Sequence, residues 1–83
     1  MNNEMMIDRI VEIVNESLDG LEITKEQKNV DLTTLGLTSI SLIRMIVALE
    51  DEYGCLIPDD KLFVDEMSTL SKILNVLYTA INS

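Results

Sequence analysis

The sequence contains no histidine among its 83 residues. Without histidine the chain cannot form the Ser-His or Cys-His pairs of many enzymes, and it lacks the commonest zinc ligand. None of its acidic runs, which are Glu50 to Glu52, Asp59-Asp60 and Asp65-Glu66, has the spacing of an EF-hand calcium loop. We therefore predict that the protein is not an enzyme and holds no specific metal site.

Cysteine and aromatic residues are also scarce. Cys55 is the only cysteine, so no disulfide can form within the chain, and its apolar neighbours favour a small buried residue over a reactive thiol. Aromatic residues make up 4% of the sequence and hydrophobic residues 47%, so the core must consist of Ile, Leu, Val and Met, which suits packed helices. The length predicts one small domain, residues 1–83, without the deep pocket of a metabolic enzyme.

Basic residues are few as well, because 6 Lys and Arg against 15 Asp and Glu give a net charge of −9. That charge repels nucleic acid and anionic lipid and favours basic protein surfaces. The alternative is that the acidic residues only keep a small protein soluble. No apolar run is long enough to span a bilayer, and the first residues lack the basic flank of a signal peptide. We predict a cytoplasmic monomer that binds neither nucleic acid nor membranes.

Helical spacing of apolar residues predicts a first helix from Met5 to Leu18, capped by Asn2 or Asn3 and ending near Asp19-Gly20. Residues 21–34 have no sustained period and predict a long surface loop, which a small domain tolerates only if the loop is anchored to the core. The expected anchors of this loop are Leu21, Ile23, Val30, Leu32 and Leu35.

Two further segments follow near the end of the chain. Pro58 predicts a turn or short helix from Asp59 to about Val64. Ser68 is the best cap for a last helix, whose predicted buried stripe is Leu70, Ile73, Leu74, Leu77 and Ile81. With the helix described next, the predicted fold is all-α, a bundle of three main helices and one short helix with a long first loop.

The second main helix begins after the glycine turn at Gly36, because Thr38 and Ser39 can both accept hydrogen bonds from a first helical turn. It ends at Gly54. Ser39 is thus predicted at the positive end of the helix dipole with its hydroxyl toward water. The residues expected on the buried side are Ile40, Ile43, Ile46, Val47, Glu50 and Tyr53.

On this interpretation, the opposite face of the second helix carries Ser41, Leu42, Arg44 and Met45. Leu42 and Met45 would then form an exposed apolar docking surface beside Ser39. The alternative is that the long first loop covers one or both of them.

The run Leu35-Gly36-x-x-Ser39-Ile40, the helix ending at Gly54 and the continuation Ile57 to Asp60 together resemble the phosphopantetheine-binding family of acyl and peptidyl carrier proteins. In that family the serine of a Gly-x-Asp-Ser-Leu motif receives the phosphopantetheine arm. The resemblance implies that Ser39 is this serine. Thr38 stands where the family usually has aspartate, and Arg44 stands where fatty-acid carriers commonly have an acid.

The resemblance also implies the partners. A phosphopantetheinyl transferase would move 4'-phosphopantetheine from coenzyme A to Ser39, a loading enzyme would attach an acyl or aminoacyl group, and downstream synthases or transferases would use it. Their predicted contact residues are Thr38, Ile40, Ser41, Leu42, Arg44 and Met45.

Thr38 and Arg44 favour a stand-alone carrier of a dedicated polyketide or nonribosomal peptide pathway over a housekeeping fatty-acid carrier. The alternative from another functional class is an acidic helical adaptor protein that is not modified on Ser39. A hydrolase with a Ser39 nucleophile would need a base, and the sequence offers none.

Overall fold

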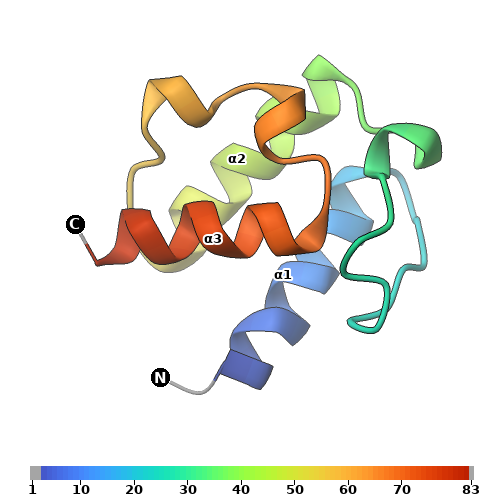
Figure 1. The fold of residues 1–83 in the computed structure, drawn as a ribbon, viewed down its shortest axis with the longest axis horizontal. Helices are drawn as coiled ribbons and strands as arrows, with labels where there is room; N and C mark the ends of the chain where they lie inside the picture. Colours follow the sequence, from blue (N-terminus) through green and yellow to red (C-terminus); the bar gives the residue numbers. More distant parts are fainter. Residues whose placement is uncertain (1–2, 83) are drawn as a thin grey trace.

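A computed structural model describes residues 3–82 as three α-helices joined by loops with short 3-10 turns. The helices are α1 (Asn3–Ser17), α2 (Ser39–Tyr53) and α3 (Leu70–Ile81), and the turns are η1 (Leu32–Leu35), η2 (Asp59–Lys61) and η3 (Val64–Glu66). The described residues contain no strand. Figure 1 shows α3 crossing the front of the molecule with α2 behind it, and α1 packs against both. The predicted all-α fold is confirmed.

The first helix buries one apolar face. Ile10, Ile13 and Val14 are buried, and Leu18 just beyond the helix is buried too. Asp19 and Gly20 both have positive φ angles, which turn the chain away from the helix axis where the end was predicted. Asn2, one of the two predicted caps, lies outside the described residues.

The second helix is rotated relative to the prediction. Its buried residues are Leu42, Met45, Ile46 and Leu49. Of the predicted buried stripe only Ile46 belongs to this set, whereas Ile40, Ile43 and Val47 are 70%, 63% and 59% exposed. The predicted exposure of Leu42 and Met45 is therefore wrong.

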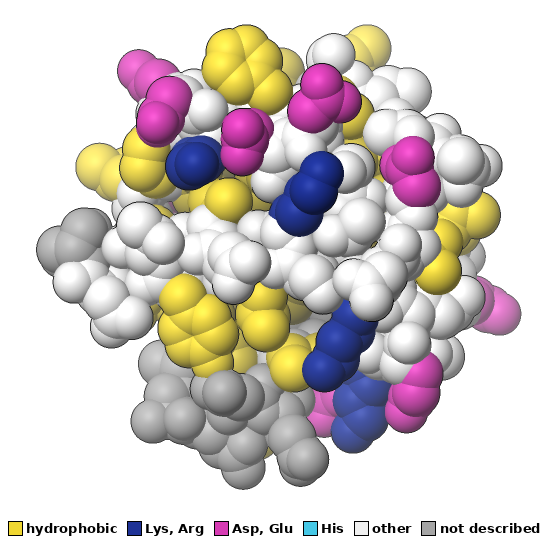
Figure 2. Space-filling view, viewed as in Figure 1, with side chains coloured by type: hydrophobic (Ala, Val, Ile, Leu, Met, Phe, Trp, Pro, Cys, Tyr) yellow, Lys and Arg dark blue, Asp and Glu magenta, His cyan; other side chains and the backbone are white. Residues whose placement is uncertain are grey.

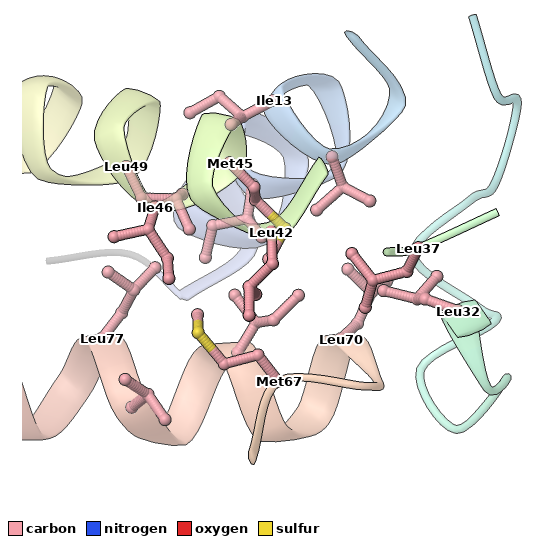
Figure 3. Close-up of a cluster of buried hydrophobic side chains, with 14 of the residues drawn as sticks. Ile13, Leu32, Leu37, Leu42, Met45, Ile46, Leu49, Met67, Leu70 and Leu77 are labelled. Atoms are coloured by element: carbon pink, nitrogen blue, oxygen red, sulfur yellow. The ribbon is translucent and has the colours of Figure 1, made fainter. Parts of the chain in front are cut away.

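Packing against the other helices explains this rotation. Figure 3 shows Leu42 and Ile46 pointing toward α3 and Met67, with Met45 and Leu49 also turned into the cluster. Because α2 has apolar residues at helical spacing on two faces, its own sequence is compatible with either orientation. Packing against α1 and α3 buries the face that carries Leu42 and Met45.

The long first loop is anchored, as predicted. Ile23 and Leu32 are buried, and Leu37 adds a third anchor that was not predicted. Leu35 is 37% exposed, so its predicted role as an anchor is wrong; it occupies the outer side of η1. Hydrogen bonds hold the loop in place. The Asn15 amide donates to the Ile23 carbonyl at 3.1 Å and accepts from the Ile23 N–H at 3.0 Å. The Ser68 carbonyl accepts from the Leu32 N–H at 2.7 Å.

The segment between α2 and α3 has a turn where a turn or short helix was predicted from Asp59, and a second turn that was not predicted. It contains two separate 3-10 turns, η2 and η3, and is fixed at its two ends by the buried residues Ile57 and Met67. The Glu50 carboxylate accepts a hydrogen bond from the Ile57 N–H at 2.9 Å. The cap of α3 is Thr69 rather than the predicted Ser68, because the Thr69 hydroxyl accepts from the Lys72 N–H at 3.2 Å.

The third helix buries its predicted stripe in part. Leu70, Ile73 and Leu77 are buried as predicted, while Leu74 and Ile81 are half-buried. Cys55, in the loop after α2, is half-buried against the core, and burial raises the pKa of its thiol. A raised pKa lowers the thiolate fraction at neutral pH, which agrees with the expectation of an unreactive thiol.

Candidate functional site

Ser39 is the first residue of α2 and is exposed. Gly36 takes a φ of 109°, a left-handed conformation that glycine adopts without strain, and ends η1 just before the helix. Thr38 is extended and caps α2, with its hydroxyl accepting from the Ser41 N–H at 3.3 Å. The predicted helix start is confirmed, and Ser39 is held on a rigid element.

The hydrogen bonds of the first turn leave Ser39 available. Within residues 3–82, no hydrogen bond joins the Ser39 hydroxyl to another group, and the N–H groups of Ser39 and Ile40 have no acceptor. The Leu42 N–H is satisfied by the Thr38 carbonyl at 2.8 Å. An exposed hydroxyl therefore lies beside two free N–H donors at the positive end of a helix. This arrangement suits a phosphate ester on the hydroxyl, because the two free N–H groups and the helix dipole stabilise its negative charge.

The other predicted contact residues do not all lie at the surface. Thr38 and Ile40 are exposed, and Ser41 is half-buried with its hydroxyl 3.3 Å from the Thr38 hydroxyl. The Arg44 side chain is 59% exposed. Leu42 and Met45 are only 3% and 0% exposed, so the predicted docking patch made of these two residues does not exist.

A groove opens beside Ser39 instead. It has a volume of about 340 Å³ and runs between α2 and the segment that contains η3. We call it the α2 groove, and its lining residues are Ser39, Leu42, Ile43, Ile46, Val47, Leu62, Phe63 and Val64. Ile43, Val47 and Phe63 were not among the contact residues predicted from the sequence. Ile43 and Val47 had been assigned to the buried stripe of the helix, and nothing near Phe63 in the sequence points to the groove.

Charge around this region is mostly negative. In Figure 2 acidic side chains gather over the upper part of the visible face, where Figure 1 places the segment between α2 and α3.

Asp31, the cap of η1, accepts hydrogen bonds from the Thr33 hydroxyl and N–H at 2.6 and 2.9 Å, and these bonds lower the pKa of its carboxyl. The residues that the structure describes include no cluster of three or more His, Cys, Asp or Glu side chains arranged to hold a metal ion.

The family described as "Phosphopantetheine attachment site" matches residues 8–77, which is most of the chain and includes Ser39. The chain belongs to this phosphopantetheine-binding carrier family. Membership implies a covalently attached 4'-phosphopantetheine, and the resemblance stated from the sequence is confirmed. None of the helices in residues 3–82 is both long and apolar enough to cross a bilayer.

Two relatives of this carrier support the same assignment. The acyl carrier protein of Thermobifida fusca (strain YX) is 31% identical over 74 residues, covering 87% of this chain and 89% of the relative. The acyl carrier protein homolog of Ureaplasma parvum serovar 3 (strain ATCC 700970) is 31% identical over 68 residues, covering 82% of this chain and 83% of the relative. The carrier is thus similar to acyl carrier proteins over nearly its whole length.

Proposed function

We propose that Ser39 is the attachment residue for 4'-phosphopantetheine and that the protein is a non-catalytic carrier of acyl or aminoacyl groups. The observation that carries this proposal is the exposed Ser39 hydroxyl at the start of α2, without a hydrogen-bond partner within residues 3–82. When attached, the arm supplies a terminal thiol that holds its cargo as a thioester.

Two residues of this chain have roles in the proposal. Ser39 provides the oxygen that forms the new phosphoester bond, while the pyrophosphate bond of coenzyme A breaks and adenosine bisphosphate leaves. Thr38 holds the first turn of α2, whose two free N–H groups would favour the negative charge of a phosphate attached to Ser39. No group within residues 3–82 accepts a hydrogen bond from the Ser39 hydroxyl, so the proposal assigns the proton of that hydroxyl to a base of the transferase.

For the pathway, we propose a dedicated polyketide or nonribosomal peptide route, in which the carrier acts as a cytoplasmic monomer. Support comes from Thr38 and Arg44, which replace the acids usual at these positions of fatty-acid carriers. A housekeeping acyl carrier protein is the second candidate, because both relatives are named acyl carrier proteins. Since the arm carries the cargo, the chain itself does not select it.

The proposal predicts two successive mass gains. Incubation with coenzyme A and a phosphopantetheinyl transferase should add one phosphopantetheinyl group, and a loading enzyme should then add an acyl or aminoacyl group. Hydroxylamine should remove only the second gain, because it cleaves a thioester and leaves a phosphoester intact. Intact-mass measurement follows all three steps. An unmodified adaptor shows no gain, and a hydrolase acylated on the serine oxygen gains mass without coenzyme A.

Thr38 should decide which transferase acts on the carrier. Aspartate and threonine are both good caps, so Thr38→Asp should change stability by no more than about 1 kcal/mol. It adds a carboxylate beside Ser39 that a basic transferase side chain can bind with a charge-assisted hydrogen bond worth about 1.5–3 kcal/mol. A selective fatty-acid-type transferase should therefore modify Thr38→Asp faster than the natural protein, whereas a tolerant transferase should treat both alike. Equal rates in all four combinations would leave the pathway proposal resting on Arg44 alone.

A further inference from the structure

The first loop carries a pair of lysines on an otherwise acidic protein. Lys25 and Lys28 are both exposed, and they are two of only 6 basic residues against 15 acidic ones. The ion pairs within residues 3–82 use other basic residues, so neither lysine has a carboxylate partner there. Figure 2 shows basic side chains close together at the lower right of the visible face, where Figure 1 places the first loop.

Hydrogen bonds on both sides of the lysine pair fix the backbone that carries it. The Gln27 side-chain oxygen accepts from the Thr24 N–H at 2.9 Å, and the Gln27 N–H donates to the Thr24 carbonyl at 3.0 Å, which closes a turn around Lys25. The Lys28 carbonyl accepts from the Ser71 N–H of α3 at 3.1 Å. Because this backbone is already ordered, a ligand of the two lysines has little loop-ordering cost to overcome.

A hollow lies beside the two lysines. It has a volume of about 450 Å³ and is lined by Ile7 of α1 together with Lys25, Glu26 and Lys28 of the loop. A smaller cavity of about 20 Å³ adjoins it, since Ile7 and Lys28 line both. The remaining residues of the smaller cavity, from α1 and α3, are Ile10, Leu70, Ser71 and Leu74.

We call the hollow and the smaller cavity together the loop hollow. Its floor is aliphatic, because the side chains of Ile7, Ile10, Leu70 and Leu74 are hydrocarbon and the stems of the lysines add to them. The charged ends of the lysines lie at its rim, exposed to solvent. A space with an apolar floor and ammonium groups at its rim fits a ligand that combines an aliphatic group with negative charge.

The charges indicate which ligand of this kind fits. Glu26 is the single acid that lines the loop hollow, against two ammonium groups without a carboxylate partner. The net charge of −9 acts at longer range, but at physiological salt charges more than about 8 Å away are largely screened. An anionic membrane would face the wider acidic surface of the protein, which repels it. A short protein segment meets only the loop hollow, so an acidic segment is favoured.

We propose that the loop hollow is a docking site for an acidic segment of a partner protein. The segment inserts a branched aliphatic side chain against Ile7 and Leu74 and places carboxylates beside Lys25 and Lys28. No residue of α2 lines the loop hollow, so the site is separate from Ser39 and from the α2 groove. The partner can therefore hold the protein while Ser39 stays accessible.

The probe for this proposal is the synthetic peptide acetyl-Glu-Glu-Leu-Glu-Glu-amide, titrated into isotope-labelled protein at physiological salt and followed by NMR. We expect shifts of the backbone N–H signals of residues 24–29 and of those near Ile7 and Leu74, with a Kd in the millimolar range. The double variant Lys25→Gln with Lys28→Gln keeps part of each aliphatic stem and removes both charges, so its Kd should rise roughly tenfold or more. Lys61→Gln is the matched control, because it removes the same charge outside the loop hollow and should leave the Kd unchanged.

Further measurements separate the charged part of the contact from the apolar part. Glu26→Gln removes the carboxylate from the rim and should lower the Kd, whereas a site for a cation would respond in the opposite direction. A peptide with alanine in place of leucine should bind several-fold more weakly, because it buries less apolar surface. A peptide with glutamine in place of every glutamate should cause no shifts.

The absence of shifts with the acidic peptide overturns the proposal, and so does an unchanged Kd for the lysine double variant. If the natural protein binds vesicles of phosphatidylglycerol through the two lysines but does not bind the peptide, the ligand is a lipid and the proposal is wrong. It is equally wrong if sedimentation shows an oligomer that the double variant dissociates, because the loop hollow then holds a second copy. The titration needs neither coenzyme A nor a transferase, so its result is independent of the proposed function. Circular dichroism of each variant checks that the fold is retained.

Discussion

Replacing Met45 with aspartate is expected to unfold the protein. Met45 is fully buried in the cluster between the three helices. Truncation of a buried methionine to alanine costs about 2–5 kcal/mol, and an unpaired buried carboxylate adds several kcal/mol more. Domains of this size have a total stability of about 5–15 kcal/mol, so the variant should have little or no cooperative melting transition by circular dichroism.

Val47→Asp is the matched control for this experiment. It introduces the same charge two residues further along α2, on a side chain that is 59% exposed. Its stability should differ from that of the natural protein by no more than about 0.5 kcal/mol. If Met45→Asp melted normally and Val47→Asp were unfolded, the helix would have the orientation first predicted from the sequence, and the packing described above would be contradicted.

The orientation of α2 shows where sequence reasoning reaches its limit. The helix start and end depend on local chemistry, namely the Thr38 cap and the positive φ of Gly54, and both were predicted correctly. The buried face depends on the surfaces that α1 and α3 present, which no local pattern of α2 contains. A helix with apolar residues on two faces therefore has predictable ends and an ambiguous orientation.

The same distinction applies to the candidate site. The Gly36 turn and the exposed Ser39 at the start of a helix could be predicted, because each is a property of a few consecutive residues. The α2 groove could not, since its far wall comes from residues 62–64, which are more than a helix away in sequence. The predicted exposed patch of Leu42 and Met45 was wrong for the reason that made the orientation wrong.

Replacing Ser39 with alanine is expected to abolish the attachment of phosphopantetheine completely. The variant removes the exposed hydroxyl at the first position of α2. Neither the Thr38 hydroxyl, which caps the helix, nor the Ser41 hydroxyl is expected to take its place in the same transferase pose. Ser41 lies about 200° around the helix from Ser39, at about 100° per residue. It is also half-buried, and its hydroxyl is 3.3 Å from that of Thr38. The cap of α2 is Thr38, so Ser39→Ala should keep the helical fold and the melting temperature.

The most direct test of the carrier assignment is the intact mass of the protein after incubation with coenzyme A and a tolerant phosphopantetheinyl transferase. Three proteins should be compared in parallel: the natural sequence, Ser39→Ala, and Ser41→Ala, which removes the neighbouring hydroxyl from the same helical turn. We predict that the natural protein and Ser41→Ala each gain the mass of one phosphopantetheinyl group, while Ser39→Ala gains nothing. A full gain by Ser39→Ala, or no gain by the natural protein under conditions that modify an acyl carrier protein in the same tube, would contradict the assignment.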